Sequence, residues 1–305
     1  MNELRELERR YKEGLITKEG YIRLMHEQHQ RLWDYAAFIK DRNVSCINIM
    51  SSEILLTTKD DVTLLCDSSD RRIAPIELLN FGDYEPVETK MMLGFVDEHS
   101  IIVDIGANIG WYSIVLARKA RQGRVFAFEP MPTTFTYLQK NLLLNRTNNV
   151  ETFNYGLSDK KETIEFFFDP NLSAATSARN IYEDPTKHRV SANVCRMDDV
   201  LADLERIDLI KCDVEGAEIF VLYGGIETLR RTKPILFLEM LRKWTAKFAY
   251  HPNKIIELLS NLGYHCYCVE DSKLLEITRV DEETIQTNFF FLDPIKHRHR
   301  LDLFV

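Results

Sequence analysis

One short segment, IIVDIGANIGWYS, combines residue types that suit the binding of a nucleotide-like ligand. Four residues of buried-strand character end in an acid, Asp104, and two glycines follow at Gly106 and Gly110. Glycine lets a backbone turn sharply and approach a ligand closely, and the helix expected after the second glycine presents free N–H groups at its start. The spacing therefore predicts a strand–turn–helix unit with a ligand at the turn.

The acid before the turn narrows the class of ligand. The pattern is D-x-G-x-N-x-G, whereas dinucleotide-binding turns usually carry G-x-G-x-x-G. A carboxylate at Asp104 would repel a pyrophosphate but suits a ligand with an ammonium and a sulfonium group, such as S-adenosylmethionine. We therefore favour S-adenosylmethionine over NAD, and a dehydrogenase is the weaker alternative.

A second acid, Glu129, ends the next expected strand, nineteen residues after Gly110. An acid at this place can accept hydrogen bonds from both hydroxyls of a ribose, and it would repel a 2′-phosphate. The alternative is that Asp104 and Glu129 only cap nearby helices. The two acids, the two glycines and the strand–turn–helix context together favour the cofactor site.

Further acids follow a later strand, in the motif KCDVEGAE. Asp213 ends that strand and Glu215 lies just beyond it. In an open α/β sheet, ligands bind outside the carboxyl ends of the strands, so both acids should face the same cleft as Gly106 and Glu129. Lys211 lies inside the strand and needs a carboxylate partner if it is buried.

The elements that must position these residues alternate along the chain. From Ser100 onward, strand and helix signals follow one another, as expected for parallel strands joined by crossover helices. A late strand, NFFFLD, follows another strand without a helix between them and suits an antiparallel insertion at the sheet edge. The polar stretch from Pro170 to Ser191 is either a loop that faces the substrate or an ordinary surface insertion.

The first 75 residues differ from the rest. Residues 2–40 have apolar side chains at helical spacing, and residues 45–67 form two β-like runs separated by a short polar connection. We expect a helical arm and a β-hairpin over residues 1–75, and a catalytic domain over residues 76–305. The arm could pack on its own catalytic domain or on a second subunit, which would make a homo-oligomer, and the sequence does not choose between these.

Composition excludes several classes of protein. The 39 Lys and Arg against 47 Asp and Glu give a net charge of −8, which disfavours nucleic acid as a partner. The chain has no apolar run long enough to span a membrane and begins with a charged segment, so we expect a cytoplasmic protein without a membrane partner. Six scattered cysteines without CxxC spacing favour neither a disulfide framework nor a zinc site.

Six segments together carry a family resemblance: VDIGANIGWYS (103–113), FAFEP (126–130), YGLSD (155–159), DLIKCDVEGAE (208–218), VLYGG (221–225) and PILFLEM (234–240). With these segments the chain resembles the FkbM-type family of S-adenosylmethionine-dependent methyltransferases. The resemblance runs from about Phe81 to Phe291 and leaves the N-terminal extension outside it. It implies an α/β fold of the class I methyltransferase (Rossmann-like) type, with a seven-stranded, mostly parallel sheet that contains one antiparallel strand.

The resemblance also implies a reaction and a set of site residues. The reaction would be methyl transfer from S-adenosylmethionine to a hydroxyl of a small molecule, a sugar or a polyketide-like metabolite, in a biosynthetic pathway. The methionine end of the cofactor would lie at Asp104, Gly106, Ala107, Asn108 and Gly110, its ribose at Glu129, its adenine near Leu157 and Ser158, and the acceptor beside Asp213, Glu215 and Glu239, with Asp213 also bordering the cofactor.

The general base is left open by the sequence. Family members that carry a histidine shortly after the position of Glu239 have Met240 and Leu241 here instead. We hypothesise that Glu215 or Asp213 takes the proton of the acceptor hydroxyl while Glu239 orients the acceptor.

Two alternatives keep the fold but change the function. A metal-assisted O-methyltransferase would need two or three clustered oxygen ligands, and the strand that ends at Glu239 offers one acid followed by Met240, so we expect no metal. A non-catalytic scaffold would use the fold only as a platform for the arm. The intact glycine turn with Glu129 and Asp213 disfavours that scaffold.

Overall fold

The computed structural model describes residues 3–71, 73–168, 177–178 and 188–304. Most of the polar stretch between Pro170 and Ser191, which we considered as a substrate-facing loop, lies outside the described residues. Among the described residues, no helix combines the length and the apolar character that a membrane crossing requires.

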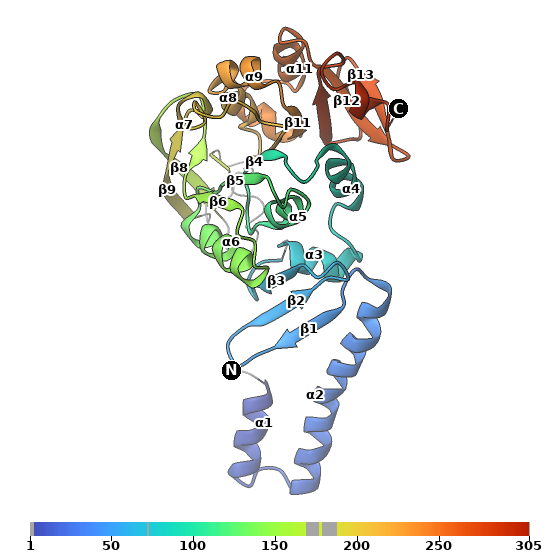
Figure 1. The fold of residues 1–305 in the computed structure, drawn as a ribbon. Coiled ribbons are helices and arrows are strands. Elements are labelled where there is room, and N and C mark those ends of the chain that lie inside the picture. Colours follow the sequence, from blue (N-terminus) through green and yellow to red (C-terminus); the bar gives the residue numbers. More distant parts are fainter. Residues whose placement is uncertain (1–2, 72, 169–176, 179–187, 305) are drawn as a thin grey trace.

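The centre of the molecule is an eight-stranded sheet with the order β13-β12-β14-β11-β10-β4-β5-β6 (Figure 1). Its strands are β4 (Ile101–Ile105), β5 (Arg124–Phe128), β6 (Val150–Phe153), β10 (Leu209–Cys212), β11 (Ile235–Glu239), β12 (His265–Glu270), β13 (Lys273–Ile277) and β14 (Asn288–Leu292). The five strands from β6 to β11 are parallel. β14 lies between β11 and β12 and is antiparallel to both.

This order confirms the predicted Rossmann-like class and the antiparallel direction of the late strand. The predicted position of that strand at the sheet edge is wrong, because β14 pairs with a strand on each side. The described sheet has one strand more than the seven expected, because β13 forms a hairpin with β12 at the edge. Its turn contains Asp271 and Ser272, which both have positive φ angles (47° and 63°). Aspartate tolerates this conformation better than most residues do, which makes the connection a recognisable hairpin turn.

Helices cover both faces of the central sheet. They are α4 (Pro86–Phe95), α5 (Trp111–Lys119), α6 (Pro132–Leu144), α7 (Met197–Val200), α8 (Glu218–Tyr223), α9 (Ile226–Thr232), α10 (Arg242–Thr245), α11 (Asn253–Ser260) and α12 (Arg298–Leu301), with a 3₁₀ turn η3 (Ala246–Phe248). Alternate residues of β5 enter two separate cores: Val125 and Ala127 one, Phe126 and Phe128 the other. A strand buried on both faces reads as a continuous apolar run, which is what the sequence shows.

A smaller sheet follows β6 in the chain. It has the order β7-β9-β8, with β7 (Gly156–Leu157), β8 (Glu162–Phe168) and β9 (His188–Cys195). β8 and β9 are antiparallel neighbours, and β7 pairs parallel with β9.

The N-terminal region contains the expected helical arm and more β structure than expected. Its helices are α1 (Glu3–Lys12), α2 (Lys18–Phe38), η1 (Ile39–Asp41) and α3 (Ala74–Phe81), and its strands are β1 (Cys46–Ile49), β2 (Ile54–Thr57) and β3 (Thr63–Cys66). β1 joins the predicted hairpin to make a three-stranded antiparallel sheet. Figure 1 shows α1 and α2 projecting from the rest of the molecule.

A buried asparagine is one of several residues that attach the three-stranded sheet to α6. Asn141, fully buried, accepts a hydrogen bond from the N–H of Leu65 in β3 and donates one to the carbonyl of Ile109 in the glycine turn. Leu56 and Leu64 also belong to the same apolar core as residues of the central sheet. The boundary near residue 75 remains a prediction, since the core is continuous across it.

Candidate active site

The glycine turn follows β4 and passes against the end of β10. Gly106 has a φ angle of 74°, and a Cβ atom there would lie 1.9 Å from the carbonyl oxygen of Asp213. No side chain fits at that distance, so glycine is required for the two strand ends to meet. Gly110 has a φ angle of 95°, and its Cβ would lie 2.6 Å from the side chain of Leu138 on α6. The turn is thus held closely on both sides.

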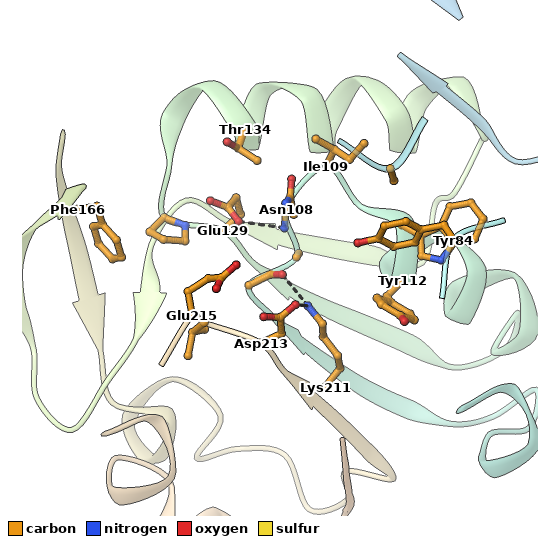
Figure 2. A pocket seen from close by; sticks show the side chains of 16 residues that line it. Tyr84, Asn108, Ile109, Tyr112, Glu129, Thr134, Phe166, Lys211, Asp213 and Glu215 are labelled. Atoms are coloured by element: carbon orange, nitrogen blue, oxygen red, sulfur yellow. Dashed lines mark hydrogen bonds and ion pairs between the residues drawn. The ribbon is translucent and has the colours of Figure 1, made fainter. Parts of the chain in front are cut away.

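Glu129 closes the turn from the end of β5. Its carboxylate accepts hydrogen bonds from the N–H groups of Asn108 (3.0 Å) and Met131 (2.9 Å), and Figure 2 shows the first of these contacts. Burial raises the pKa of Glu129 to about 7, although both amides lower it. The side-chain oxygen of Asn108 is buried without a hydrogen-bond partner, which suits a contact with a ligand.

Lys211 supplies a buried positive charge at the centre of the site. Its ammonium group donates a hydrogen bond to the carbonyl of Gly106 (2.8 Å) and lies 3.4 Å from Asp213 and 3.7 Å from Asp104. Burial disfavours the charge, but the two carboxylates outweigh it and raise the pKa of Lys211. Asp104 is fully buried beneath the turn and also accepts a hydrogen bond from Ser113 (2.6 Å). Lys211 therefore has two carboxylate partners, where the sequence predicted a need for one.

The loop after β10 is held by Glu218. The carboxylate of Glu218 accepts hydrogen bonds from the N–H groups of Val214 and Gly216, and it also contacts the hydroxyl of Tyr250 (3.2 Å). Glu215, between them, has a φ angle of 56°, a left-handed conformation that is uncommon for a residue with a side chain. Such strain persists where surrounding contacts enforce it and is frequent at functional sites.

Three acids meet at the ends of β10 and β11. Carboxylate oxygens of Asp213, Glu215 and Glu239 all lie within 4.8 Å of one another. Burial raises the pKa of Glu239 well above its usual value, and the charges of Asp213 and Glu215 raise it further. Burial and these neighbouring charges therefore favour the protonated form of Glu239 beside Asp213. The same three groups are close enough to hold a divalent cation.

Sequence reasoning missed three residues on the opposite side of the site. Tyr84 and Tyr112 line the pocket near Lys211 (Figure 2), and the Tyr112 hydroxyl donates a hydrogen bond to the carboxylate of Glu85. Glu85 has a φ angle of 44° and precedes a proline. Burial raises its pKa to about 6. The Glu-Pro pair was the one sequence signal for this region, because an acid followed by proline often marks the start of a helix.

Six of the predicted residues line a common pocket: Gly106, Ala107, Asn108, Glu129, Asp213 and Glu215. The other five are not part of its lining. Asp104 is beneath the turn, Gly110 caps α5, and Glu239 adjoins Asp213. Leu157 is buried in β7, and Ser158 follows it and is held by a backbone hydrogen bond to Cys195. The individual roles of these residues remain predictions.

The sheet order, the glycine turn after β4 and the acids at the ends of β5 and β10 define a class I methyltransferase fold. A family model described as the methyltransferase FkbM domain matches residues 104–266, more than half of the chain. The chain belongs to the FkbM methyltransferase family.

Three curated relatives show how far the similarity extends. Methyltransferase sdnD of Sordaria araneosa is 35% identical over 40% of this chain and 59% of its own length. The hexuronic acid methyltransferase AglP of Haloferax volcanii is 29% identical over 46% of this chain and 56% of its own length. The 2-O-methyltransferase NoeI of Sinorhizobium fredii is 28% identical over 44% of this chain and 60% of its own length. The chain thus matches less than two thirds of each relative.

Replacing Lys211 tests whether its charge is required. In Lys211→Met, Asp104 stays buried without a counter-charge, so we expect a loss of about 3–5 kcal/mol in the free energy of unfolding at pH 7. The loss should shrink at lower pH, where a proton can replace the ammonium group. Urea denaturation measures both effects. Lys119→Met, at an exposed position on α5, is the matched control and should change stability by less than about 0.5 kcal/mol. A Lys211→Met protein as stable as the control would contradict this role.

Proposed function

We propose that this protein is an S-adenosylmethionine-dependent O-methyltransferase that acts on a hydroxyl group of a small molecule. The convergence of the glycine turn, Glu129 and the Asp213–Glu215 loop on one pocket carries the proposal. The fit to the cofactor rests on the unpartnered side-chain oxygen of Asn108, a residue that lines this pocket. When bound, the cofactor supplies a methyl group activated by a sulfonium.

Charge supports this ligand over a phosphorylated one. Lys211 is the single Lys or Arg among the described residues that line the pocket, while Glu129, Asp213 and Glu215 are acids in the same lining. Such a pocket attracts a sulfonium and repels a phosphate. The charge of the pocket thus argues against a phosphorylated acceptor. A sugar is the first candidate because one relative is named a hexuronic acid methyltransferase, and another, named a 2-O-methyltransferase, supports oxygen as the methylated atom.

We assign the general base to Glu215. Its carboxylate points into the pocket between Glu129 and Asp213 in Figure 2, from a strained backbone that Glu218 holds in place. Asp213 is already ion-paired with Lys211. In this scheme Glu215 accepts the proton of the acceptor hydroxyl, and the side chains of Glu239 and Asp213 orient the acceptor oxygen toward the methyl group.

The pH dependence of cofactor binding tests the role of Glu129. Ribose hydroxyls donate to the ionised carboxylate, whose pKa is about 7, so binding should strengthen as pH rises. If only the ionised form binds, the Kd for S-adenosylhomocysteine falls about tenfold between pH 6 and pH 8. Isothermal titration calorimetry measures this dependence. Glu129→Gln should bind weakly with a flat profile, and equal slopes for both proteins would rule out the assignment. No binding at all by the intact protein would favour the scaffold alternative.

A pair of isosteric variants tests the base. Glu215→Gln should keep cofactor binding and lower kcat by about 10²–10⁴-fold, since a positioned base contributes that much. Asp213→Asn should mainly raise KM for the acceptor. The assay follows transfer of labelled methyl groups to candidate sugars and metabolites. Unchanged turnover in Glu215→Gln would contradict the assignment.

Removal of metal ions by a chelator distinguishes the metal-independent reaction from the metal-assisted alternative. The ammonium of Lys211 already provides positive charge 3.4 Å from Asp213, so we expect turnover to be unaffected by EDTA. A loss of activity that magnesium restores would favour a cation held by Asp213, Glu215 and Glu239 instead.

A further inference from the structure

The second half of helix α2, at the base of the arm in Figure 1, is exposed along its whole length. Every residue from His29 to Phe38 is exposed, including the large apolar side chains of Leu32, Trp33 and Tyr35. Helix α2 has 21 residues and buries none of them. Most of the stability of a protein helix comes from the packing of an apolar face, so a helix of this kind is incomplete without a partner.

The short helix α1 covers only the first part of α2. Tyr11 stacks on Tyr21 with ring centres 4.7 Å apart, and Glu3, where α1 begins, contacts Gln28. Beyond Gln28, the stripe of α2 that faces α1 continues as Leu32, Tyr35 and Ile39 without α1 beside it. The stripe therefore has a covered half and an open half.

The open half forms one wall of an apolar groove of about 760 Å³. The opposite wall is the β1–β2 hairpin, with Ile47, Ile49 and Ile54, and α6 contributes Tyr137. Ile49 is 63% exposed, which is unusual for an apolar residue beside a cavity. The groove and the uncovered part of α2 are thus one continuous apolar surface at the base of the arm.

The distribution of charge along the chain favours a second copy of this chain as the partner of this surface. Residues 1–41 contain eight basic and eight acidic side chains, so the arm is neutral and the net charge of −8 lies on the rest of the chain. A neutral apolar surface selects neither a basic nor an acidic partner, and it can meet its own copy without repulsion. The acidic bodies of two copies, by contrast, repel each other and must stay apart.

An antiparallel pairing of two arms satisfies both conditions. Helix α2 is ~31 Å long, so bodies at opposite ends of paired arms are separated by several Debye lengths of about 8 Å at physiological salt. If the pairing is centred between Glu27 and Gln28, Ile22 of one copy lies opposite the partner's Trp33. The exposed Leu15 at the tip of each arm then comes level with Lys40 at the base of the other, beside the groove.

We propose that the arm is a dimerisation element, in which α2 packs antiparallel against α2 of a second copy and the arm tip of each copy covers the groove of the other. The four helices make a bundle with one isologous interface, in which the same patch is used twice. Its main apolar contacts are Ile22 against the partner's Trp33 and Leu15 against the groove. The interface is distant from the residues of the methyl-transfer site and does not depend on the proposed function.

Analytical ultracentrifugation of the full chain tests the oligomeric state. The wild type should be a dimer at micromolar concentration, and Ile22→Glu and Trp33→Glu should each weaken dimerisation at least about tenfold. Leu143→Glu replaces an exposed apolar residue on α6 and should remain dimeric. Circular dichroism and urea unfolding check that each variant is folded. A monomeric wild type, or variants that stay dimeric, would overturn the proposal.

Two further measurements test the contact itself. In Ile22→Glu/Trp33→Lys, the new charges face each other across the interface, so dimerisation should partly recover relative to either single variant. Trp33 is exposed in the single chain, whereas Trp111 and Trp244 are buried. Acrylamide quenching of tryptophan emission should therefore increase on dilution of the wild type and not of Trp33→Phe. No recovery, or quenching that is independent of concentration, counts against the antiparallel register.

Discussion

The buried ammonium group of Lys211 is the contact on which the rest of the site depends. It joins the carbonyl of Gly106 to the carboxylates of Asp104 and Asp213, and so connects the ends of β4 and β10. Lys211 and Asp104 are register partners in adjacent parallel strands, which places the two side chains on the same face of the sheet. Without this cation, the carboxylates of Asp104 and Asp213 would repel each other, and Asp104 would be buried without a counter-charge.

The steric fit between the two strands is as strict as the electrostatic one. The backbone of Gly106 passes so close to Asp213 that no side chain fits between them. This close approach brings the glycine turn and the acidic loop to one cavity. Glu218 holds the loop in its unusual backbone conformation by accepting hydrogen bonds from two of its N–H groups. Glu218 is therefore a structural acid, whereas Glu215 beside it faces the pocket.

The N-terminal region is divided in its relation to the rest of the chain. The three-stranded sheet is attached through Asn141 and shares an apolar core with the central sheet. The arm contributes one buried residue, Leu7 of α1, and α2 contributes none. The methyltransferase body can therefore be stable on its own core, while the arm is exposed and suited to a separate task.

The sequence by itself determined the fold class and six of the residues that line the pocket. Alternating strand and helix signals, two glycines at fixed spacing and acids at strand ends are local patterns, and a strand buried on both faces leaves a continuous apolar run that needs no other information. Only the tertiary structure decided how Lys211 is neutralised, that Asp104 lies beneath the pocket, and that Glu85 and Tyr112 approach it from the other side. These depend on strand register and on contacts between residues far apart in the chain, for which the sequence carries no periodic signal.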